Sequence, residues 1–374
     1  MEISIFDLIN PNFKISVDLS EELKNKIRSK IKHKISDLSK KLKLKTARLY
    51  EYFIWKNSAI PLEVLLKISN LLKISKDEIE QNIIMYKQLH VPGKNSIKNP
   101  KLPIKINLYF TSLIANLFFD GSVPNDGKGT YYNQKHKEIM ENFIKKIKEI
   151  FGDVSYSLIL DHKGVLKCRL PRLIGEICKC VYNVKSFGTF DSRIPEFMFK
   201  LNKKHKIAFI LTSIIDEGSI TYDGQIMFGV SNKLLCNDVR ELCQELGLET
   251  TKVTQKSSSN YFYFYIKSQD KLLKIIESIN KNYPLISLNY KEKRLRYYFE
   301  IKKYPGLRTQ NGGNLRKKKI LESLKKGKKS VNQLSMELLI LPRSLRRHLN
   351  FLEKNSKIKK EKRGSEYFYS LIFH

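Results

Sequence analysis

Residues 207–220 read Ile207-Ala-Phe-Ile-Leu-Thr-Ser-Ile-Ile-Asp-Glu-Gly-Ser-Ile220, an apolar helix pattern that ends in the acidic pair Asp216 and Glu217. A related stretch lies upstream at residues 110–123, where an apolar helix pattern ends in a single carboxylate, Asp120. In both stretches glycine and serine follow the acid. The two acids are separated by about the length of one compact αβ unit. The pair predicts a pseudo-twofold domain in which two helices each place a carboxylate at their C-terminal end.

The segments around the two acidic stretches also repeat. Each is followed by a turn, a strand pattern and a polar triplet, which is Asn133-Gln134-Lys135 in the first half and Ser231-Asn232-Lys233 in the second. The second stretch is preceded by Arg193-Ile-Pro-Glu-Phe-Met-Phe199. Over about residues 104–290 these features resemble the LAGLIDADG homing-endonuclease family. The resemblance implies two sheets that form a saddle over the major grooves of DNA, with one strand cut per acid.

A carboxylate at the C-terminal end of a helix lies beside unpaired backbone carbonyls and the negative end of the helix dipole. Such oxygens suit Mg²⁺, which can activate water for phosphodiester hydrolysis. The resemblance assigns the catalytic, metal-binding places to Asp120 and Glu217. It further implies that Gln134 and Asn232 position water, and that Lys267 stabilises charge.

In the family, two positions of each motif hold small residues, which let the two helix backbones approach closely. This chain departs from that pattern at most of these positions. Counted back from the glycines, these positions hold Ala115 and Phe119 in the first half and Thr212 and Asp216 in the second. Only alanine is small. Counted forward, residues 211–216 fit the opening six residues of the family motif, and one residue is then missing before the glycine, which leaves open which acid holds the catalytic place. Asp216 therefore stays an alternative to Glu217 as metal ligand, although the Gly-Ser that follows favours Glu217.

The composition points to a polyanionic partner. The chain has 374 residues, 41% of them apolar, which is enough for packed cores in two or three domains. It carries 70 Lys and Arg against 37 Asp and Glu, a net charge of +33. This excess favours nucleic acid over a membrane. The five cysteines have no zinc spacing and the sequence has neither a membrane-spanning run nor a signal peptide, so we expect a cytoplasmic protein with reduced thiols.

Residues 1–92 are expected to form a helical DNA-binding domain, with consecutive short helices over 20–90. Patterns at 35–44, 46–55 and 61–72 predict two helices around a tight turn and a support helix that starts at proline. This order resembles the repressor-type helix-turn-helix family, whose second helix enters the major groove. The residues that would contact DNA are Lys45, Thr46, Arg48 and Tyr52. A plain helical bundle is the alternative. Residues 93–103 have the breaker residues of a linker.

The central domain is expected at residues 104–300, with halves at about 104–185 and 194–290. Each half has the order helix-β-β-α-β-β-α, and Asp223-Gly224 marks a hairpin turn in the second half. The strands predicted in that half are 219–222, 225–230, 249–254 and 261–267. One face of each sheet would meet DNA. The candidates on that face include Tyr222, Gln225, Lys252, Thr254, Tyr261 and Tyr263.

Residues 301–374 are very basic and are predicted to hold three helices and a hairpin, with a hinge at 311–314. This arrangement resembles a winged helix. Its candidates for DNA contact are Arg316 and Lys317 in the basic run, Arg343, Arg346 and Arg347 on the third helix, and Lys362 and Arg363 at the hairpin turn. A winged helix used only for dimerisation is the alternative.

The sequence thus predicts an α+β protein of three parts that binds double-stranded DNA. Because the two halves of the central domain are unequal, we expect the protein to bind as a monomer. The leading function is a Mg²⁺-dependent, site-specific LAGLIDADG-type endonuclease. The first alternative is a non-catalytic transcription regulator on the same fold, in which Asp120 and Glu217 only cap helices. A third possibility is an RNA-splicing maturase.

Overall fold

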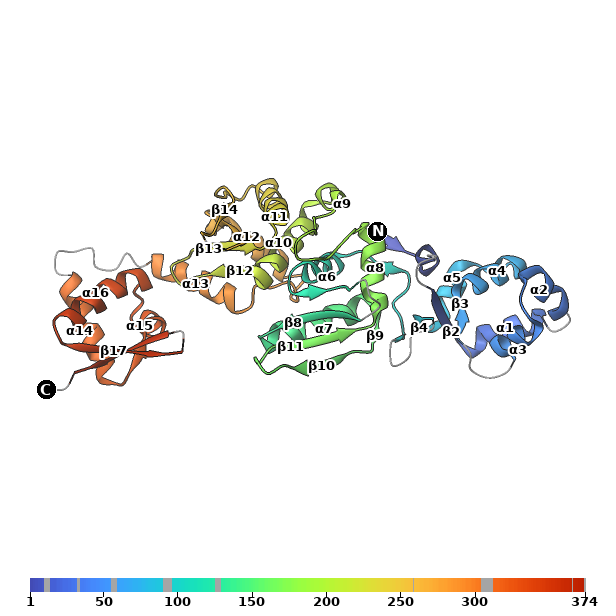
Figure 1. Ribbon diagram of the computed structural model, residues 1–374, viewed down its shortest axis with the longest axis horizontal. Coiled ribbons are helices and arrows are strands. Elements are labelled where there is room, and N and C mark those ends of the chain that lie inside the picture. Colours follow the sequence, from blue (N-terminus) through green and yellow to red (C-terminus); the bar gives the residue numbers. More distant parts are fainter. Residues whose placement is uncertain are drawn as a thin grey trace.

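A computed structural model describes residues 1–9, 14–31, 34–54, 59–89, 96–124, 129–257, 259–303, 312–364 and 366–372. Helices and strands occur together in every part of the chain, so the fold is α+β as predicted. Figure 1 shows an elongated molecule in which an N-terminal part (blue), a central part and a C-terminal part (red) follow one another along the long axis. One apolar core runs through the first two parts, and the C-terminal part has a core of its own.

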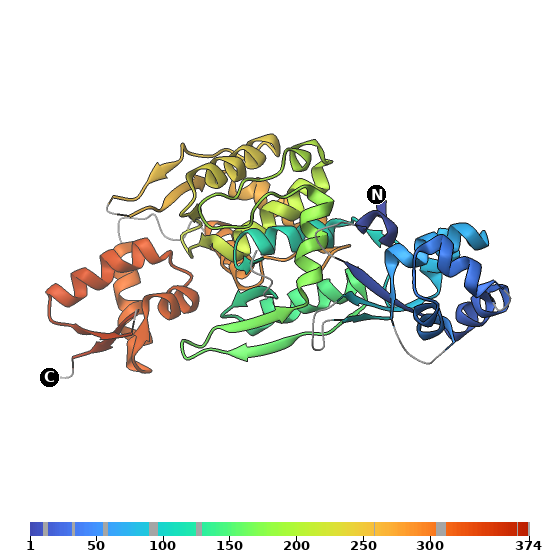
Figure 2. The same ribbon diagram turned by 45° about the vertical axis from the view of Figure 1, so that its right-hand side comes forward.

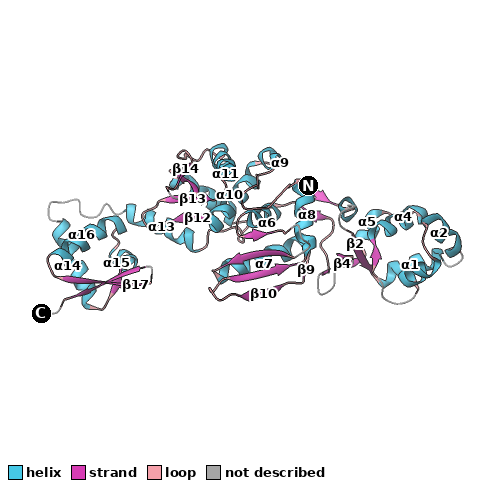
Figure 3. Ribbon diagram, in the orientation of Figure 1, coloured by secondary structure: helices cyan, strands magenta, loops and turns pink. Residues whose placement is uncertain are grey.

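The N-terminal part packs helices against a small sheet, as Figure 3 shows. The elements are β1 (Glu2–Ile3), a 3₁₀ helix (Ile5–Leu8), β2 (Ile15–Leu19), α1 (Glu21–Ile31), α2 (Ile35–Leu42), α3 (Thr46–Phe53), β3 (Ile60–Pro61), α4 (Leu62–Leu72), α5 (Lys76–Gln81) and β4 (Ile83–Gln88). The prediction of helices throughout 20–90 was wrong for β4. This strand pairs antiparallel with β2, where Val17 lies opposite Tyr86, and both residues are fully buried. Pairing with a distant strand therefore decided its structure.

Local signals explain the helix starts in this part. Ser20 Oγ accepts a hydrogen bond from the Leu23 amide at 3.2 Å, and Ser75 Oγ accepts one from the Glu78 amide at 3.1 Å. Pro61 directly precedes α4, where its fixed φ suits a helix start. Between α2 and α3 the chain turns at Lys43, whose φ is 53°. The predicted order of helix, tight turn, helix and support helix is present. The last residue of the second predicted helix, Trp55, lies outside the described residues.

Part of the stretch expected to be a linker belongs to a sheet. Residues 96–98 form β5 (Ser96–Lys98), which pairs with β4 on one side and with β9 (Asp153–Val154) of the central part on the other. The sheet order is β3-β2-β4-β5-β9. Because Ile97 is fully buried in this sheet, residues 96–98 join the two parts through packed backbone.

The central part contains the predicted repeat. Its first half comprises β6 (Ile104–Lys105), α6 (Leu108–Phe118), β7 (Gly121–Ser122), β8 (Thr130–Gln134), α7 (Lys137–Phe151), β10 (Ser157–Leu160), β11 (Leu166–Leu170) and α8 (Arg172–Tyr182). Its second half comprises α9 (Glu196–Lys200), α10 (Lys203–Glu217), β12 (Gly218–Ile220), β13 (Ile226–Val230), α11 (Lys233–Glu245), β14 (Thr254–Gln255), β15 (Phe262–Ile266) and α12 (Gln269–Asn280). The sheets run β7-β8-β11-β10 and β12-β13-β15-β14. In both sheets the order across the sheet is therefore first, second, fourth and third strand, counted along the chain. Figure 2 shows the two sheets (green and gold) as separate layers.

The sequence patterns located most elements of the central part within a few residues. The hairpin at Asp223-Gly224 is present, with Gly224 at a φ of 75°. The strand predicted over 249–254 was wrong in extent, because only a single bridge at Thr250 and the short β14 pair with β15. A further helix, α13 (Tyr290–Lys303), follows the repeat and was not predicted.

The C-terminal part is a small α+β unit. It contains α14 (Gly312–Lys325), β16 (Lys329–Ser330), α15 (Val331–Leu338), α16 (Pro342–Lys354), β17 (Ile358–Arg363) and β18 (Glu366–Leu371). The three strands run β16-β18-β17, and the turn between β17 and β18 contains Gly364 at a φ of 59°. The predicted hinge at 311–314 was wrong for residues 312–314, which form the first turn of α14. Residue 311 lies outside the described residues.

Candidate functional site

Both acidic stretches end in a turn that only glycine permits. Asp120 lies two residues after the end of α6 at Phe118, and a Cβ added at Gly121 would lie 2.4 Å from a backbone atom of that helix. Glu217 ends α10, and a Cβ added at Gly218 would lie 2.6 Å from a backbone carbonyl oxygen of that helix. The chain therefore folds back against the last turn of its own helix. As a result, the first strand of each sheet starts immediately after the acid.

α6 and α10 pack against each other, and larger side chains replace the small residues expected between them. Ser112 Oγ and Thr212 Oγ1 share a hydrogen bond of 2.7 Å across the interface. Phe119 packs edge-on against Phe209 and Phe228, with ring centroids 6.0 and 5.6 Å apart. Polar pairs and aromatic contacts thus accommodate side chains at positions where close backbone contact would require small residues.

Asp216 is the centre of a buried hydrogen-bond network. Tyr132 donates to Asp216 Oδ1 at 2.7 Å, and Asn116 Nδ2 donates to Asp216 Oδ2 at 2.8 Å. Lys146 Nζ in turn donates to Asn116 Oδ1 at 2.5 Å and to Ser112 Oγ at 2.7 Å. Burial raises the pKa of Asp216, while the donors from Tyr132 and Asn116 oppose that shift. Both carboxylate oxygens of Asp216 are therefore engaged within the protein.

Asp120 and Glu217 are less engaged. The Asp120 carboxylate accepts one long hydrogen bond, 3.3 Å, from Gln134 Nε2. Within the described residues no hydrogen bond or ion pair engages the Glu217 carboxylate. Burial raises the pKa of Asp120, and the charges of Asp216 and Glu217 raise it further. Burial also raises the pKa of Glu217 to about 7, again with a contribution from Asp216. These mutual effects show that the three acids form one cluster at the ends of α6 and α10.

Lys291 on α13 lies against the same cluster. Its Nζ donates to the carbonyl oxygens of Ile214 at 2.9 Å, Ile215 at 2.5 Å and Gly218 at 2.7 Å. The residue is only 4% exposed. Burial lowers the pKa of Lys291 to about 8, although the three nearby carboxylates oppose the shift. The unpaired carbonyls at the end of α10 are thus capped by an ammonium group from a distant helix.

Sequence reasoning did not single out Lys291 or the partners of Asp216. Lys291 is one of many basic residues in its region, and nothing local marks it as buried. Tyr132 and Asn116 sit within ordinary strand and helix patterns. One general expectation was available: the last four backbone carbonyls of every helix lack a partner within the helix and need donors from elsewhere. That clue does not say which donor supplies them.

Two of the three acids keep carboxylate oxygens that few protein donors use. Among the described residues, no group of three or more Asp, Glu, His or Cys side chains is arranged to hold a metal. Asp120 and Glu217 offer oxygen atoms that few protein donors use, which is the chemistry that Mg²⁺ accepts together with water and phosphate. The carbonyls at the end of α10 already bind Lys291. Asp120 and Glu217 are therefore the residues that would hold a divalent ion, whereas the carbonyls at the end of α10 are already occupied.

Two other predicted site residues lie apart from the cluster. Asn232 caps α11, where its Oδ1 accepts from the Leu235 amide at 3.1 Å and its Nδ2 donates to the Ser192 carbonyl at 2.8 Å. Lys267 is exposed just after β15, and within the described residues its ammonium contacts no acid of the cluster. Of the proposed water-positioning and charge-stabilising residues, only Gln134 reaches the acids.

Most candidates for DNA contact lie on the surface. The exposed ones are Lys45, Thr46, Arg48, Gln225, Lys252, Arg343, Arg346, Arg347, Lys362 and Arg363, and the half-buried ones are Tyr52, Tyr222, Arg316 and Lys317. The Tyr222 ring packs edge-on against Tyr297 and lies under the Arg294 guanidinium. The Asp223 carboxylate accepts from the Arg343 amide at 3.0 Å and lies 3.7 Å from Arg346. The hairpin turn of the second half therefore touches the start of α16.

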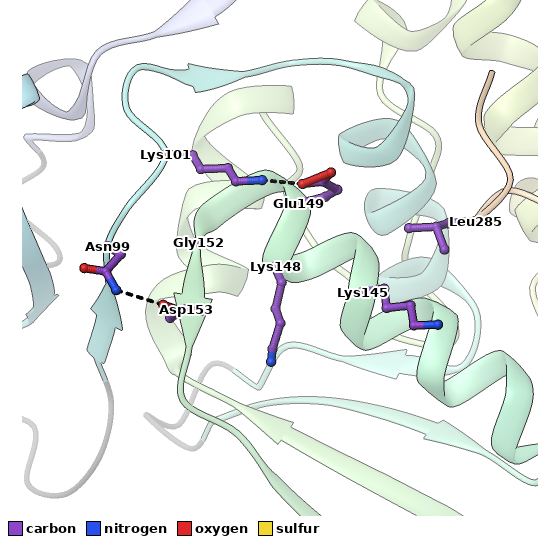
Figure 4. A pocket seen from close by; sticks show the side chains of 8 residues that line it. All are labelled: Asn99, Lys101, Lys145, Lys148, Glu149, Gly152, Asp153 and Leu285. Atoms are coloured by element: carbon purple, nitrogen blue, oxygen red, sulfur yellow. Dashed lines mark hydrogen bonds and ion pairs between the residues drawn. The ribbon is translucent and has the colours of Figure 1, made fainter.

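A surface pocket of about 560 Å³ lies at the C-terminal end of α7 (Figure 4), and its lining includes none of the three acids of the cluster. In this pocket Lys101 forms an ion pair with Glu149, and Asn99 Nδ2 donates to Asp153 Oδ2 at 2.9 Å. These contacts fasten the segment after β5 to the central part. The pocket thus belongs to the joint between the two parts.

Comparisons with known proteins give short or weak matches. No protein-family model matches the chain. Among curated proteins, an archaeal Lon protease from Pyrococcus abyssi is 30% identical over 61 residues, which are 16% of this chain and 6% of that protein. The chain thus spans only a small fraction of the length of this relative. Among the described residues, no helix is both long and apolar enough to cross a membrane.

The similar solved structures cover about half to two thirds of this chain. The homing endonuclease I-DmoI in complex with DNA and Mn is 15% identical, over 46% of this chain and 97% of that chain, with a TM-score of 0.33. Full-length DUF199/WhiA from Thermatoga maritima is 12% identical, over 66% of this chain and 92% of that chain, with a TM-score of 0.34. The N-terminal LAGLIDADG domain of DUF199/WhiA is 12% identical, over 48% and 85% of the two chains, with a TM-score of 0.34.

Proposed function

We propose that this chain is a sequence-specific double-stranded DNA-binding protein with a divalent-metal-dependent endonuclease centre at Asp120 and Glu217. One observation carries the proposal. Two topologically equivalent helices deliver these carboxylates into one cluster, and neither is used up by protein donors as Asp216 is. The resemblance of the two motifs to the LAGLIDADG family agrees with this assignment.

The charge of the chain supports DNA as the partner. A net charge of +33 favours binding to the phosphate backbone. We propose three DNA-binding parts: a helix-turn-helix formed by α2 and α3, the two central sheets, and a winged helix with α16 in a groove. The exposed lysines and arginines in these parts are suited to phosphate contacts, which fix register without reading sequence.

Each residue near the acids has a role that its contacts suggest. Asp120 and Glu217 would hold the cation, which when bound lowers the pKa of water and stabilises the leaving oxygen. Gln134 orients the Asp120 carboxylate through its amide donor. Asp216 is the weaker candidate for a ligand, because Tyr132 and Asn116 already donate to both of its oxygens. Glu217 is therefore the preferred second ligand.

A non-catalytic transcription regulator is the second candidate function. It is favoured by Lys291, which supplies a positive charge at the place where a cation would otherwise neutralise the end of α10. It is also favoured by Asn232 and Lys267, which do not reach the acids. In such a protein the acidic cluster would serve only to fasten the two halves.

A cleavage assay on selected DNA separates the two functions. Duplexes that bind the full chain are selected from a randomised pool and then incubated with Mg²⁺ or Mn²⁺, or with EDTA. We expect metal-dependent cleavage that is lost in Asp120→Asn and in Glu217→Gln, while both variants still bind. The control Glu138→Gln changes an exposed acid on α7 and should cut normally. Tight binding without cleavage under any metal would establish the regulator instead.

A further inference from the structure

The hairpin between β12 and β13 is held in place by α13. Gly224 at its turn is buried against Tyr298 so closely that an added Cβ would lie 2.6 Å from the tyrosine ring. The Arg294 guanidinium lies 5.2 Å from the centre of the Tyr222 ring, on the other side of the turn. Because α13 contacts the residues on both sides of Asp223, the central part fixes where this carboxylate lies.

Asp223 reaches the first turn of α16 in the C-terminal part. Its Oδ1 accepts a hydrogen bond of 3.0 Å from the Arg343 amide, and its Oδ2 lies 3.7 Å from the Arg346 guanidinium. Amides at the start of a helix have no acceptor within the helix and carry the positive end of its dipole, so a carboxylate is favourable there. Leu341, the N-cap residue, supplies no side-chain acceptor. Asp223 thus caps, from another part of the chain, a helix whose own sequence leaves it uncapped.

A second polar contact joins the central and C-terminal parts. Ser335 Oγ on α15 donates its one hydrogen to the Ile340 carbonyl at 2.7 Å. The Tyr297 hydroxyl on α13 therefore donates to Ser335 Oγ, at 3.1 Å. The apolar cores of the two parts are separate clusters. These polar contacts can therefore open without exposing either core.

We infer that the β12-β13 hairpin and DNA compete for the start of α16, so that Asp223 must leave α16 before this helix enters a groove. The N-terminal residues of a recognition helix are those that contact base edges, and here the first turn already holds a carboxylate. Arg346, a candidate for DNA contact, lies beside the same carboxylate. An exposed ion pair and single hydrogen bonds are individually weak, so DNA phosphates can displace them. This inference rests on the proposed function in taking α16 to bind DNA.

A distance measurement without DNA tests the contact itself. Spin labels are attached at Lys281→Cys in the central part and at Lys354→Cys in the C-terminal part, two exposed positions, after Cys180→Ser removes an exposed thiol. Double electron–electron resonance then gives the distribution of distances between the labels. We expect a narrow distribution for the otherwise unchanged chain, because the contact fixes the C-terminal part against the central part.

Two variants open the contact in different ways. Asp223→Ala removes the carboxylate, and Tyr297→Phe removes one hydroxyl with no change in charge or ring packing. Each should broaden the distance distribution. Each should also raise the affinity for duplex DNA selected from a randomised pool by about three- to tenfold, because the closed contact no longer competes. Glu300→Gln removes an exposed acid on α13 and controls for lost negative charge.

Adding the selected DNA to the labelled chain supplies the deciding comparison. We expect bound DNA to broaden the distribution as Asp223→Ala does. A distribution that stays narrow on DNA would overturn the inference, because the contact would then belong to the bound form. Equal DNA affinities for the wild type, Asp223→Ala and Tyr297→Phe would overturn it while leaving the proposed DNA-binding function intact. If none of these proteins bound DNA, the proposed function and the inference would fall together.

Discussion

Asn116 on α6 donates a 2.8 Å hydrogen bond from Nδ2 to Asp216 Oδ2 on α10, while its own Oδ1 accepts from Lys146. One asparagine thus connects a buried acid of the second half to a buried base of the first. The positive charge of Lys146 also attracts the Asp216 carboxylate and acts to lower its pKa. The halves are held together by this polar path as well as by apolar packing.

Asp216 and Glu217 are neighbours in sequence, but their removal should affect stability differently. Asp216→Asn can accept from only one of its two donors, Tyr132 and Asn116, and the other donor would face an amide NH₂ group. An unsatisfied buried group costs about 1–3 kcal/mol. Glu217→Gln removes no protein hydrogen bond, so its free energy of unfolding should stay within about 0.5 kcal/mol of the wild type. Urea denaturation measures both, and equal losses would contradict this picture.

The buried Lys146 should make stability depend on pH. Burial lowers its pKa to about 8 in the folded state, whereas an unfolded lysine titrates near 10.4. The folded chain binds this proton less tightly, so the free energy of unfolding should fall as the pH drops through this window. The loss should be on the order of 3 kcal/mol between about pH 10 and about pH 8.

Lys146→Met isolates this contribution in urea titrations at both pH values. The variant should show a smaller fall than the wild type, because Lys291 still titrates in both. Lys145→Met, which changes an exposed neighbour on the same helix, should follow the wild type. If the fall is the same in all three proteins, Lys146 does not carry the shift.

Gly218 should tolerate no side chain. A Cβ there would lie 2.6 Å from the Ile214 carbonyl oxygen, which belongs to backbone that Lys291 also holds. Gly218→Ala should therefore destabilise the protein by about 1–3 kcal/mol through overpacking. Gly313→Ala is the matched control, since its nearest neighbour would be 4.0 Å away and alanine favours the helix. That variant should be neutral or up to about 1 kcal/mol more stable. Thermal unfolding that ranks the two variants the other way would refute this reading of the turn.

DNA affinity should depend strongly on salt. If roughly 6–10 phosphates are contacted, affinity should fall by about 10³ or more between 50 and 200 mM salt. Arg347 is exposed on α16, and Arg347→Ala should lower the salt slope by about one. Lys101→Ala removes a lysine that is paired with Glu149 in the α7 pocket, and should leave the slope unchanged. Fluorescence anisotropy across a salt series measures all three, and a flat wild-type curve would exclude phosphate tracking.

The sequence by itself determined the elements that local chemistry dictates. The two apolar helices with acids at their ends and the hairpin at Asp223-Gly224 lie where their patterns predicted. Their signals are periodicity, caps and turn residues, which act within a few residues of chain. The repeat itself was visible for the same reason, since each half carries the same local pattern.

Tertiary structure decided what depends on partners far along the chain. β4 became a strand because β2 offered a pairing edge, and residues 96–98 joined a sheet through β9. The different surroundings of Asp216 and Glu217 also arise from tertiary contacts, because Tyr132 and Asn116 donate only to Asp216. Lys291 lies 73 residues beyond Gly218, whose carbonyl it caps. Such contacts arise from burial and hydrogen bonding between distant segments, and local patterns of hydrophobicity and charge do not encode which distant segment will supply the partner.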